Sequence, residues 1–142
     1  MRTIVVGVDG SAGGDAALRW AMAEARQWEG RVLAIHAWEP PNLTYAVPGA
    51  YAIDEAAFEM AAKQLLTDAL SRTVDEPPFG LDERVVRGRA ADVLLTAAGD
   101  ADLLVVGSRR LGAIGRLVLG SVSNACVHHA PCAVVVVREP GE

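Results

Sequence analysis

The sequence has little that would suit a nucleic-acid-binding or membrane protein. Its 13 basic residues are outnumbered by 18 acidic ones, giving a formal net charge of -5, whereas a general nucleic-acid binder needs a broad positive field. No apolar run approaches the roughly 20 residues of a membrane-spanning helix. The start, MRTIVVGVDGS, has only a short apolar segment and does not resemble a secretory signal. We therefore expect a cytoplasmic protein that binds neither nucleic acid nor membranes.

Lysine and cysteine are also scarce. Lys63 is the only lysine, and the Gly-Lys-Ser/Thr ending of a Walker A loop is missing. This excludes a mechanism that depends on the lysine of such a loop. Cys126 and Cys132 are separated by five residues that include His128 and His129, a spacing that matches no usual zinc pattern. We expect two buried, reduced thiols and no metal site.

Alternating apolar segments predict the fold class. Short β-branched runs are followed by turn residues, and apolar residues recur at helical spacing between these runs. The predicted strands are 3–8, 31–37, 81–87, 102–106 and 133–138, and the predicted helices are 11–28, 53–73, 90–98 and 121–129. Such alternation is typical of a parallel sheet wound by right-handed crossovers. With 142 residues, we expect a single α/β domain over residues 1–142.

Two local details follow from the same patterns. Gly30 stands where the C-terminal cap of the first helix belongs. In the helix over 53–73, helical spacing predicts an inner face made of Ala57, Met60, Ala61, Leu65, Ala69 and Leu70.

Two predicted strands end in glycine-rich segments. The first ends in VVGVDGS and the fourth in LLVVGSRR. In open parallel sheets, ligands bind beyond the carboxyl ends of the strands. If these two strands are neighbours, their ends form one crevice. Asp9 stands at the first exit, where it is either a ligand contact or a turn and helix-capping residue.

The segment after the fourth strand is cationic. From Leu103 to Arg138 there is no acidic residue, while three arginines lie among the glycines. Gly107 permits a sharp turn, and a helix that starts at Gly120 and Ser121 offers free backbone N–H groups to an anion. The hydroxyls of Ser121 and Ser123 add donors. The alternative is that the glycines only shape a turn and the arginines are solvated, and the residue types alone leave both open.

Three segments resemble the universal stress protein family over essentially the whole chain: TIVVGVDGS, ADLLVVGSR and LGSVSNACVHHAPCAVVVVR. The ATP-binding members carry Gly, two residues, Gly, nine residues, Gly and then Ser or Thr. This sequence has Gly107, Arg110 in place of the second glycine, and Gly120 with Ser121. If the second position needs a left-handed backbone, a non-glycine there costs roughly 1 to 2 kcal/mol. A guanidinium could instead pair with phosphate.

The resemblance implies a Rossmann-like fold of the adenine nucleotide alpha hydrolase-like type. Its five-stranded parallel sheet has the order 3-2-1-4-5 and is sandwiched by four helices. The resemblance also implies that the ligand is ATP, bound alone or together with Mg²⁺. We expect no metal ion held by protein side chains. The residues that the resemblance places at the ligand are Gly7, Val8, Asp9, Ala37, Val106, Gly107, Gly120, Ser121, Val122 and Ser123. Arg109 and Arg110 are added as candidate ligand contacts because their guanidinium groups could pair with phosphate.

The last predicted strand indicates a dimer. AVVVV carries valines on both faces and ends the fold, so we expect it at a sheet edge. An uncovered apolar edge favours pairing with another strand, and a twofold homodimer through this strand would cover it. The family resemblance implies the same dimer.

Together these features predict a dimeric, ATP-binding regulator of the stress response. The alternative, suggested by Arg110, is a dimeric stress-related interaction protein that no longer binds nucleotide. We expect that the protein is not an enzyme. Hydrolysis needs a positioned water and a polar residue to orient it, and the sequence offers arginines but no convincing base. His128 and His129 lie toward the far end of the last helix, and no Ser-His-Asp arrangement is visible. Weak ATP hydrolysis stays open.

Overall fold

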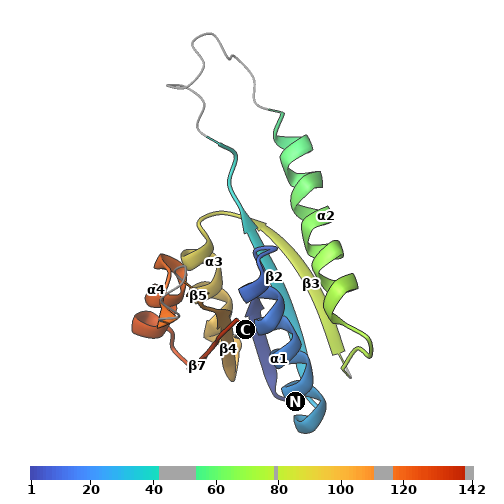
Figure 1. Ribbon diagram of the computed structural model, residues 1–142, viewed down its shortest axis with the longest axis vertical. Helices are drawn as coiled ribbons and strands as arrows, with labels where there is room; N and C mark the ends of the chain where they lie inside the picture. Colours follow the sequence, from blue (N-terminus) through green and yellow to red (C-terminus); the bar gives the residue numbers. More distant parts are fainter. Residues whose placement is uncertain (42–53, 79, 111–116, 140–142) are drawn as a thin grey trace.

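A five-stranded parallel sheet forms the centre of the molecule in the computed structural model, which describes residues 1–41, 54–78, 80–110 and 117–139 (Figure 1). Its order is β3-β2-β1-β4-β7. The strands are β1 (Thr3–Gly7), β2 (Arg31–Trp38), β3 (Gly80–Arg87), β4 (Leu103–Gly107) and β7 (Ala133–Val137). This confirms the predicted parallel sheet and its order, in which the last long strand lies at one edge.

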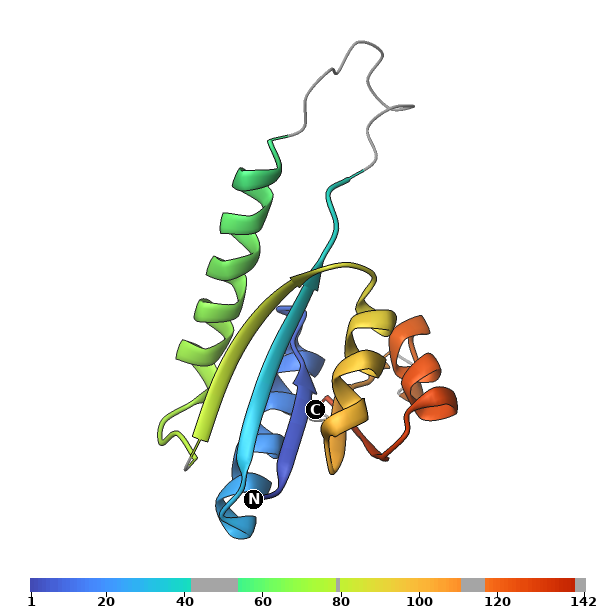
Figure 2. The ribbon, with the colours of Figure 1, turned by 180° about the vertical axis from the view of Figure 1, so that it is seen from behind.

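Helices cover both faces of the sheet. They are α1 (Ala12–Trp28), α2 (Glu55–Thr73), α3 (Ala90–Ala97) and α4 (Ser121–His129), with a short 3-10 turn, η1 (Ala98–Asp100), after α3. The helices α1 and α2 pack on one face, and α3 and α4 pack on the other (Figures 1 and 2). The predicted helix start at Ile53 lies outside the described residues. A two-residue antiparallel pair that was not predicted, β5 (Arg109–Arg110) with β6 (Leu117–Val118), follows β4.

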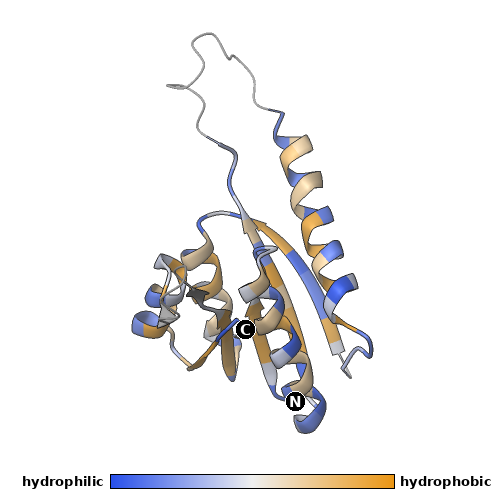
Figure 3. Cartoon of the chain, in the orientation of Figure 1, coloured by the Kyte–Doolittle hydropathy of each residue, from blue (hydrophilic) through white to orange (hydrophobic). Residues whose placement is uncertain are grey.

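Side-chain alternation along the two central strands builds two cores. Val6 and Val105 pack with α1 and α2, whereas Val5, Leu104 and Val106 pack with α3 and α4. All five side chains are buried, and the strands carry the apolar colours in Figure 3. A strand buried on both faces needs apolar residues at every position, which explains the continuous apolar runs in the sequence.

The end of α1 differs from the prediction. Glu29, not Gly30, is the left-handed C-cap, with a φ of 52°. Gly30 is instead needed for close packing, because a Cβ atom there would lie 2.8 Å from the carbonyl oxygen of Arg2. The start of α1 agrees with the prediction, since Ser11 caps it by accepting a hydrogen bond from the Gly14 N–H at 3.0 Å.

The predicted inner face of α2 is only partly right. The buried residues are Ala62, Leu66, Ala69, Leu70 and Thr73, so Ala69 and Leu70 are confirmed and Leu65 is half-buried at the core. Ala57, Met60 and Ala61 are exposed, Met60 by 71%. The reason is that the first turns of α2 extend past the sheet, so no strand lies beneath them (Figures 1 and 2).

Both cysteines are free thiols. Cys126 is buried and Cys132 is half-buried. Burial raises the pKa of both thiols above the ordinary value. The neighbouring Cys132 adds a smaller increase to the pKa of Cys126, and Asp102 adds one to the pKa of Cys132. The protonated form is therefore favoured, and neither thiol has the character of a reactive nucleophile.

Within the described ranges, no helix combines the length and the apolar character needed to cross a membrane.

Glycines bring the start of α1 against the end of β4. A Cβ atom on Gly13 would lie 2.6 Å from the carbonyl oxygen of Ser108, and one on Gly107 would collide with the backbone of Gly13. Both partners are main-chain atoms, which cannot move aside as a flexible side chain can. The two elements can approach this closely only because both positions lack a side chain.

We predict that Gly13→Ala lowers the free energy of unfolding by about 1 to 3 kcal/mol, because overpacking against backbone outweighs the gain in helix propensity. Urea denaturation followed by circular dichroism measures this. The matched control is Gly99→Ala, since a Cβ atom at Gly99 meets nothing within 4 Å. A stabilised Gly13→Ala variant would show that helix propensity, not close packing, determines the effect of this substitution on stability.

Candidate functional site

The strands β1 and β4 lie side by side at the centre of the sheet. Val6 pairs with Val105 in a parallel register, whereas the other edge of β1 pairs with β2. The winding of the sheet therefore changes direction between β1 and β4, which is the position where α/β sheets bind ligands beyond the strand ends. The two glycine-rich strand ends predicted to form one crevice do meet here.

One cavity lies at this edge of the sheet. Ten of the predicted site residues line it: Gly7, Val8, Asp9, Ala37, Val106, Gly107, Gly120, Ser121, Val122 and Ser123. Arg109 and Arg110 form β5, directly after the β4 exit, and their side chains lie outside what the structure describes. Residues from three distant parts of the sequence are thus brought together.

Seven further residues of the lining were not predicted: Ser11, Gly14, Ile35, His36, Ala90, Leu94 and Ser108. Ser11 and Gly14 belong to the start of α1, and the sequence signalled them only as a helix cap. Ile35 and Leu94 are core residues of the face covered by α3 and α4. No sequence pattern distinguishes a core leucine that also borders a cavity from one that does not.

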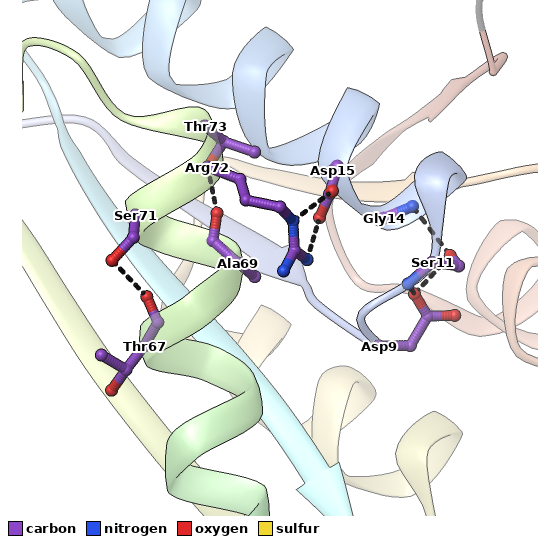
Figure 4. A network of polar contacts seen from close by, with 9 residues as sticks. All are labelled: Asp9, Ser11, Gly14, Asp15, Thr67, Ala69, Ser71, Arg72 and Thr73. Carbon is purple, nitrogen blue, oxygen red and sulfur yellow. Dashed lines mark hydrogen bonds and ion pairs between the residues drawn. The ribbon is translucent and has the colours of Figure 1, made fainter.

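Asp9 lies both at the cavity and in the turn that leads into α1. It lines the cavity, and its Oδ1 accepts hydrogen bonds from the backbone N–H of Ser11, at 3.0 Å, and from the Ser11 hydroxyl. The Ser11 Oγ in turn caps α1 through the N–H of Gly14. Figure 4 shows this chain of contacts from the β1 exit to the first turn of α1. The carboxylate is therefore held in place by the helix that it helps to start.

An ion pair fixes the same helix end to α2. The guanidinium of Arg72 binds both carboxylate oxygens of Asp15, with N–O distances of 3.0 and 3.2 Å (Figure 4). The Asp15 side chain is only 13% exposed. The hydrogen bond to Asp15 raises the pKa of Arg72 above its ordinary value. Asp15 also lies in the first turn of α1, where the helix dipole favours negative charge.

The first turn of α4 offers backbone donors to the cavity. Gly120 is the N-cap and makes no side-chain cap, and the first turn contains no acidic residue. The N–H groups of a first helical turn have no partner within the helix. Together with the helix dipole, they favour an anion at this position.

The hydroxyl of Ser123 has a different role from the one predicted. It donates its proton to the carbonyl oxygen of Gly107 at 2.7 Å, so it ties α4 to the exit of β4 instead of offering a free donor. Ser123 is buried, whereas Ser121 is exposed at the cavity. Of the two hydroxyls predicted as donors, that of Ser121 is the one on a residue exposed at the cavity.

The cavity also borders a free stretch of strand edge. The carbonyl oxygen of Ile35 accepts a hydrogen bond from the Val8 N–H at 2.8 Å. The strand β2 continues to Trp38, whereas β1 ends at Gly7. Since backbone groups alternate between the two edges of a strand, the N–H and C=O of Ala37 point to the same side as those of Ile35. They therefore face the cavity beyond the end of β1.

His36 supports this edge. Its Nδ1 lies 2.7 Å from the carbonyl oxygen of Val8. A carbonyl can only accept, so Nδ1 carries the proton in this contact. The ring thus holds the exit of β1, and with it the Asp9 loop, against β2.

The described residues contain no group of three or more His, Cys, Asp or Glu side chains that could hold a metal ion. His128 and His129 are exposed at the C-terminal end of α4 and do not line the cavity. The side chains of the site can bind and orient a ligand.

The model of the universal stress protein family matches residues 1–138. The chain belongs to the universal stress protein family. A universal stress protein of Thermus aquaticus is 39% identical over 96% of this chain and 98% of its own length. A relative from Mycolicibacterium smegmatis is 34% identical over 95% of this chain but only 47% of its own length. This universal stress protein therefore spans about half the length of the mycobacterial relative.

Solved structures of the family share the fold. A universal stress protein in complex with cAMP superposes with a TM-score of 0.74, 27% identity and 98% coverage of both chains. The Archaeoglobus fulgidus universal stress protein in complex with dAMP has a TM-score of 0.70 and 27% identity, over 96% of this chain and 98% of its own. Both relatives bind an adenine nucleotide.

We predict that Ser123→Ala lowers the free energy of unfolding by about 1 to 3 kcal/mol, because the half-buried carbonyl of Gly107 loses its donor. The exposed neighbour provides the control: Ser121→Ala should change stability by less than about 0.5 kcal/mol. Chemical denaturation of the three proteins measures the difference. Equal midpoints for the three proteins would show that the Ser123 contact does not hold α4 to β4.

Proposed function

We propose that this universal stress protein binds an adenine nucleotide in the cavity at the β1 and β4 exits and acts as a dimeric, cytoplasmic stress-response regulator with residues 1–142 as one domain. The observation that carries the proposal is the convergence of three features in one cavity: the Asp9 loop, the backbone edge at Ala37 and the first turn of α4. Two relatives with known structures bind cAMP and dAMP.

The base end of the cavity favours adenine. The N–H of Ala37 can donate to the ring nitrogen N1 of adenine, while its C=O accepts from the exocyclic amino group. Guanine presents the opposite order, a ring N–H and an exocyclic oxygen, so both contacts would become repulsive. Ile35 and Leu94 supply the apolar walls that a purine ring needs.

The phosphate end favours an anion. The first turn of α4 supplies donors, and the loop that precedes it contains arginines and no acidic residue. A triphosphate with Mg²⁺ is our proposed physiological ligand, with the Asp9 carboxylate near the ribose or the phosphate-bound Mg²⁺. Binding without turnover fits a regulator, since the two possible bases of the described lining are engaged elsewhere, Asp9 with Ser11 and His36 Nδ1 with the carbonyl of Val8.

Isothermal titration calorimetry with ATP and Mg²⁺ tests the nucleotide site. We expect saturable binding, a weaker interaction with GTP and a large loss of affinity in Asp9→Ala. No heat at millimolar ATP, with no thermal protection, would contradict nucleotide binding.

A substitution at Arg110 distinguishes this proposal from its alternative, an interaction protein that no longer binds nucleotide. The structure places Arg110 in β5, paired with Leu117. A strand residue has an extended backbone, so the cost of a left-handed arginine does not arise in this conformation. We therefore expect Arg110→Gly to change ATP affinity only slightly. ATP binding that occurs only in Arg110→Gly would support the alternative.

The two edges of the sheet differ in a way that favours a dimer through β7. The edge strand β3 carries charged residues, Asp82, Glu83 and Arg84, which oppose pairing with another strand. The edge strand β7 has the sequence AVVVV and its valines are half-buried. Pairing two copies through β7 would cover these valines and satisfy the outward backbone groups.

We predict that Val136→Pro converts the dimer into a monomer. The carbonyl of Val137 accepts a hydrogen bond from the Ser108 N–H at 2.9 Å, on the β4 side of the strand. Successive residues of a strand direct their backbone groups to opposite edges, so the N–H of Val136 points to the free edge. Proline removes this donor and leaves the β4 pairing in place. Val136→Ala, which keeps the N–H, is the control. Light scattering after size-exclusion chromatography measures the mass, and a monomeric wild-type protein would contradict the proposed dimer.

A further inference from the structure

A hydroxyl in the wall of the cavity has no partner. Ser108 is 4% exposed, and among the described residues its Oγ is the buried side-chain oxygen that makes no hydrogen bond. A buried hydroxyl without a partner destabilises a fold, so such groups are rare in native proteins and call for an explanation. The proposed function does not use this group.

The backbone of Ser108 is held on both sides. Its N–H donates to the carbonyl oxygen of Val137 at 2.9 Å, and its own carbonyl lies against Gly13 so closely that a Cβ there would be 2.6 Å away. The preceding carbonyl, of Gly107, accepts from Ser123. The backbone of residue 108 is therefore fixed, and only rotation of the side chain can bring its hydroxyl to a partner.

The side chain points toward the cavity side of the sheet. A Cβ atom on Gly107 would point at Gly13 in α1, so the next residue points to the opposite face. That face is covered by α3 and α4, and Val106 packs there. Ser108 shares the cavity lining with Gly120 and Ser121 at the start of α4.

We propose that Ser108 is a ligand-binding residue whose hydroxyl donates a hydrogen bond to a phosphoryl oxygen of the bound nucleotide. The inference rests on the proposed function. The neighbouring groups of α4 are N–H donors at a helix N-terminus, so a ligand atom that sits between them and Ser108 is best an anionic acceptor. In a nucleotide the anionic acceptors are the phosphoryl oxygens. The enclosed oxygen reaches one of them by rotation of the side chain between staggered positions.

This role gives Ser108→Ala two effects of opposite sign. Without ligand, removal of the unpartnered hydroxyl should raise the melting temperature, by about 2 to 5 °C. With AMP, the lost hydrogen bond to a charged oxygen should weaken binding about tenfold or more. A serine with a purely structural role would instead lower the melting temperature and leave the affinity for AMP unchanged.

Calorimetry with AMP, adenosine and inorganic phosphate, combined with thermal melts, tests the proposal. We expect Ser108→Ala to weaken the binding of AMP but not of adenosine, since adenosine lacks the phosphate. If the wild-type protein binds inorganic phosphate, the variant should bind it more weakly. The control is Ser71→Ala, because Ser71 lies on α2, is exposed and bonds only to Thr67 of its own helix.

The outcomes separate the two proposals. Unchanged AMP affinity in Ser108→Ala, beside clear binding by the wild-type protein, would overturn the role of Ser108 and leave the nucleotide site intact. Equal losses for AMP and adenosine would place the hydroxyl at the sugar or base and would also overturn the phosphate contact. A wild-type protein that binds neither AMP nor adenosine would overturn the proposed function together with this inference.

Discussion

The close contact between the first turn of α1 and the end of β4 is the constraint on which the rest of the structure depends. Gly13 and Gly107 meet backbone to backbone, and no residue with a side chain fits at either position. Because of this contact, the Asp9 loop, the start of α1 and the exit of β4 occupy a single small region. Ser123 then adds α4 through its bond to the Gly107 carbonyl.

The same contact explains why residues that line the cavity also support the fold at this edge of the sheet. Asp9 lines the cavity and also supports the cap of α1. Asp15, one turn on, is held by Arg72 of α2. Three contacts therefore connect Asp9 to α2: Asp9 with Ser11, the Asp15 N–H with the Ser11 carbonyl, and Asp15 with Arg72. The first turns of α2 extend past the sheet and carry two exposed large apolar side chains, Phe58 and Met60 (Figure 1).

The strands could be predicted because they depend on local sequence, whereas ten residues of the cavity lining followed from the family resemblance. A β-branched run that ends in glycine has few alternatives to a buried strand, and the family resemblance supplied the order. The inner face of α2 could not be predicted, because it depends on how far the helix extends past the strands. Glu29 forms the left-handed cap predicted for Gly30, whereas the lack of a side chain at Gly30 lets the backbone of Arg2 approach it closely. Packing between distant segments decided both cases.

The hydroxyls at the site show where sequence reasoning reaches its limit. Ser108, Ser121 and Ser123 are the same residue type within a short segment, yet one is unpartnered and buried, one is exposed, and one is bonded to Gly107. Composition predicts that hydrogen-bond donors for an anion are present, but not which of them already bond to other groups of the protein. That depends on the carbonyl groups exposed where β4 ends, which the Gly13 contact fixes. A binding site of this kind is therefore specified by which polar groups the fold leaves unsatisfied as much as by which residues it contains.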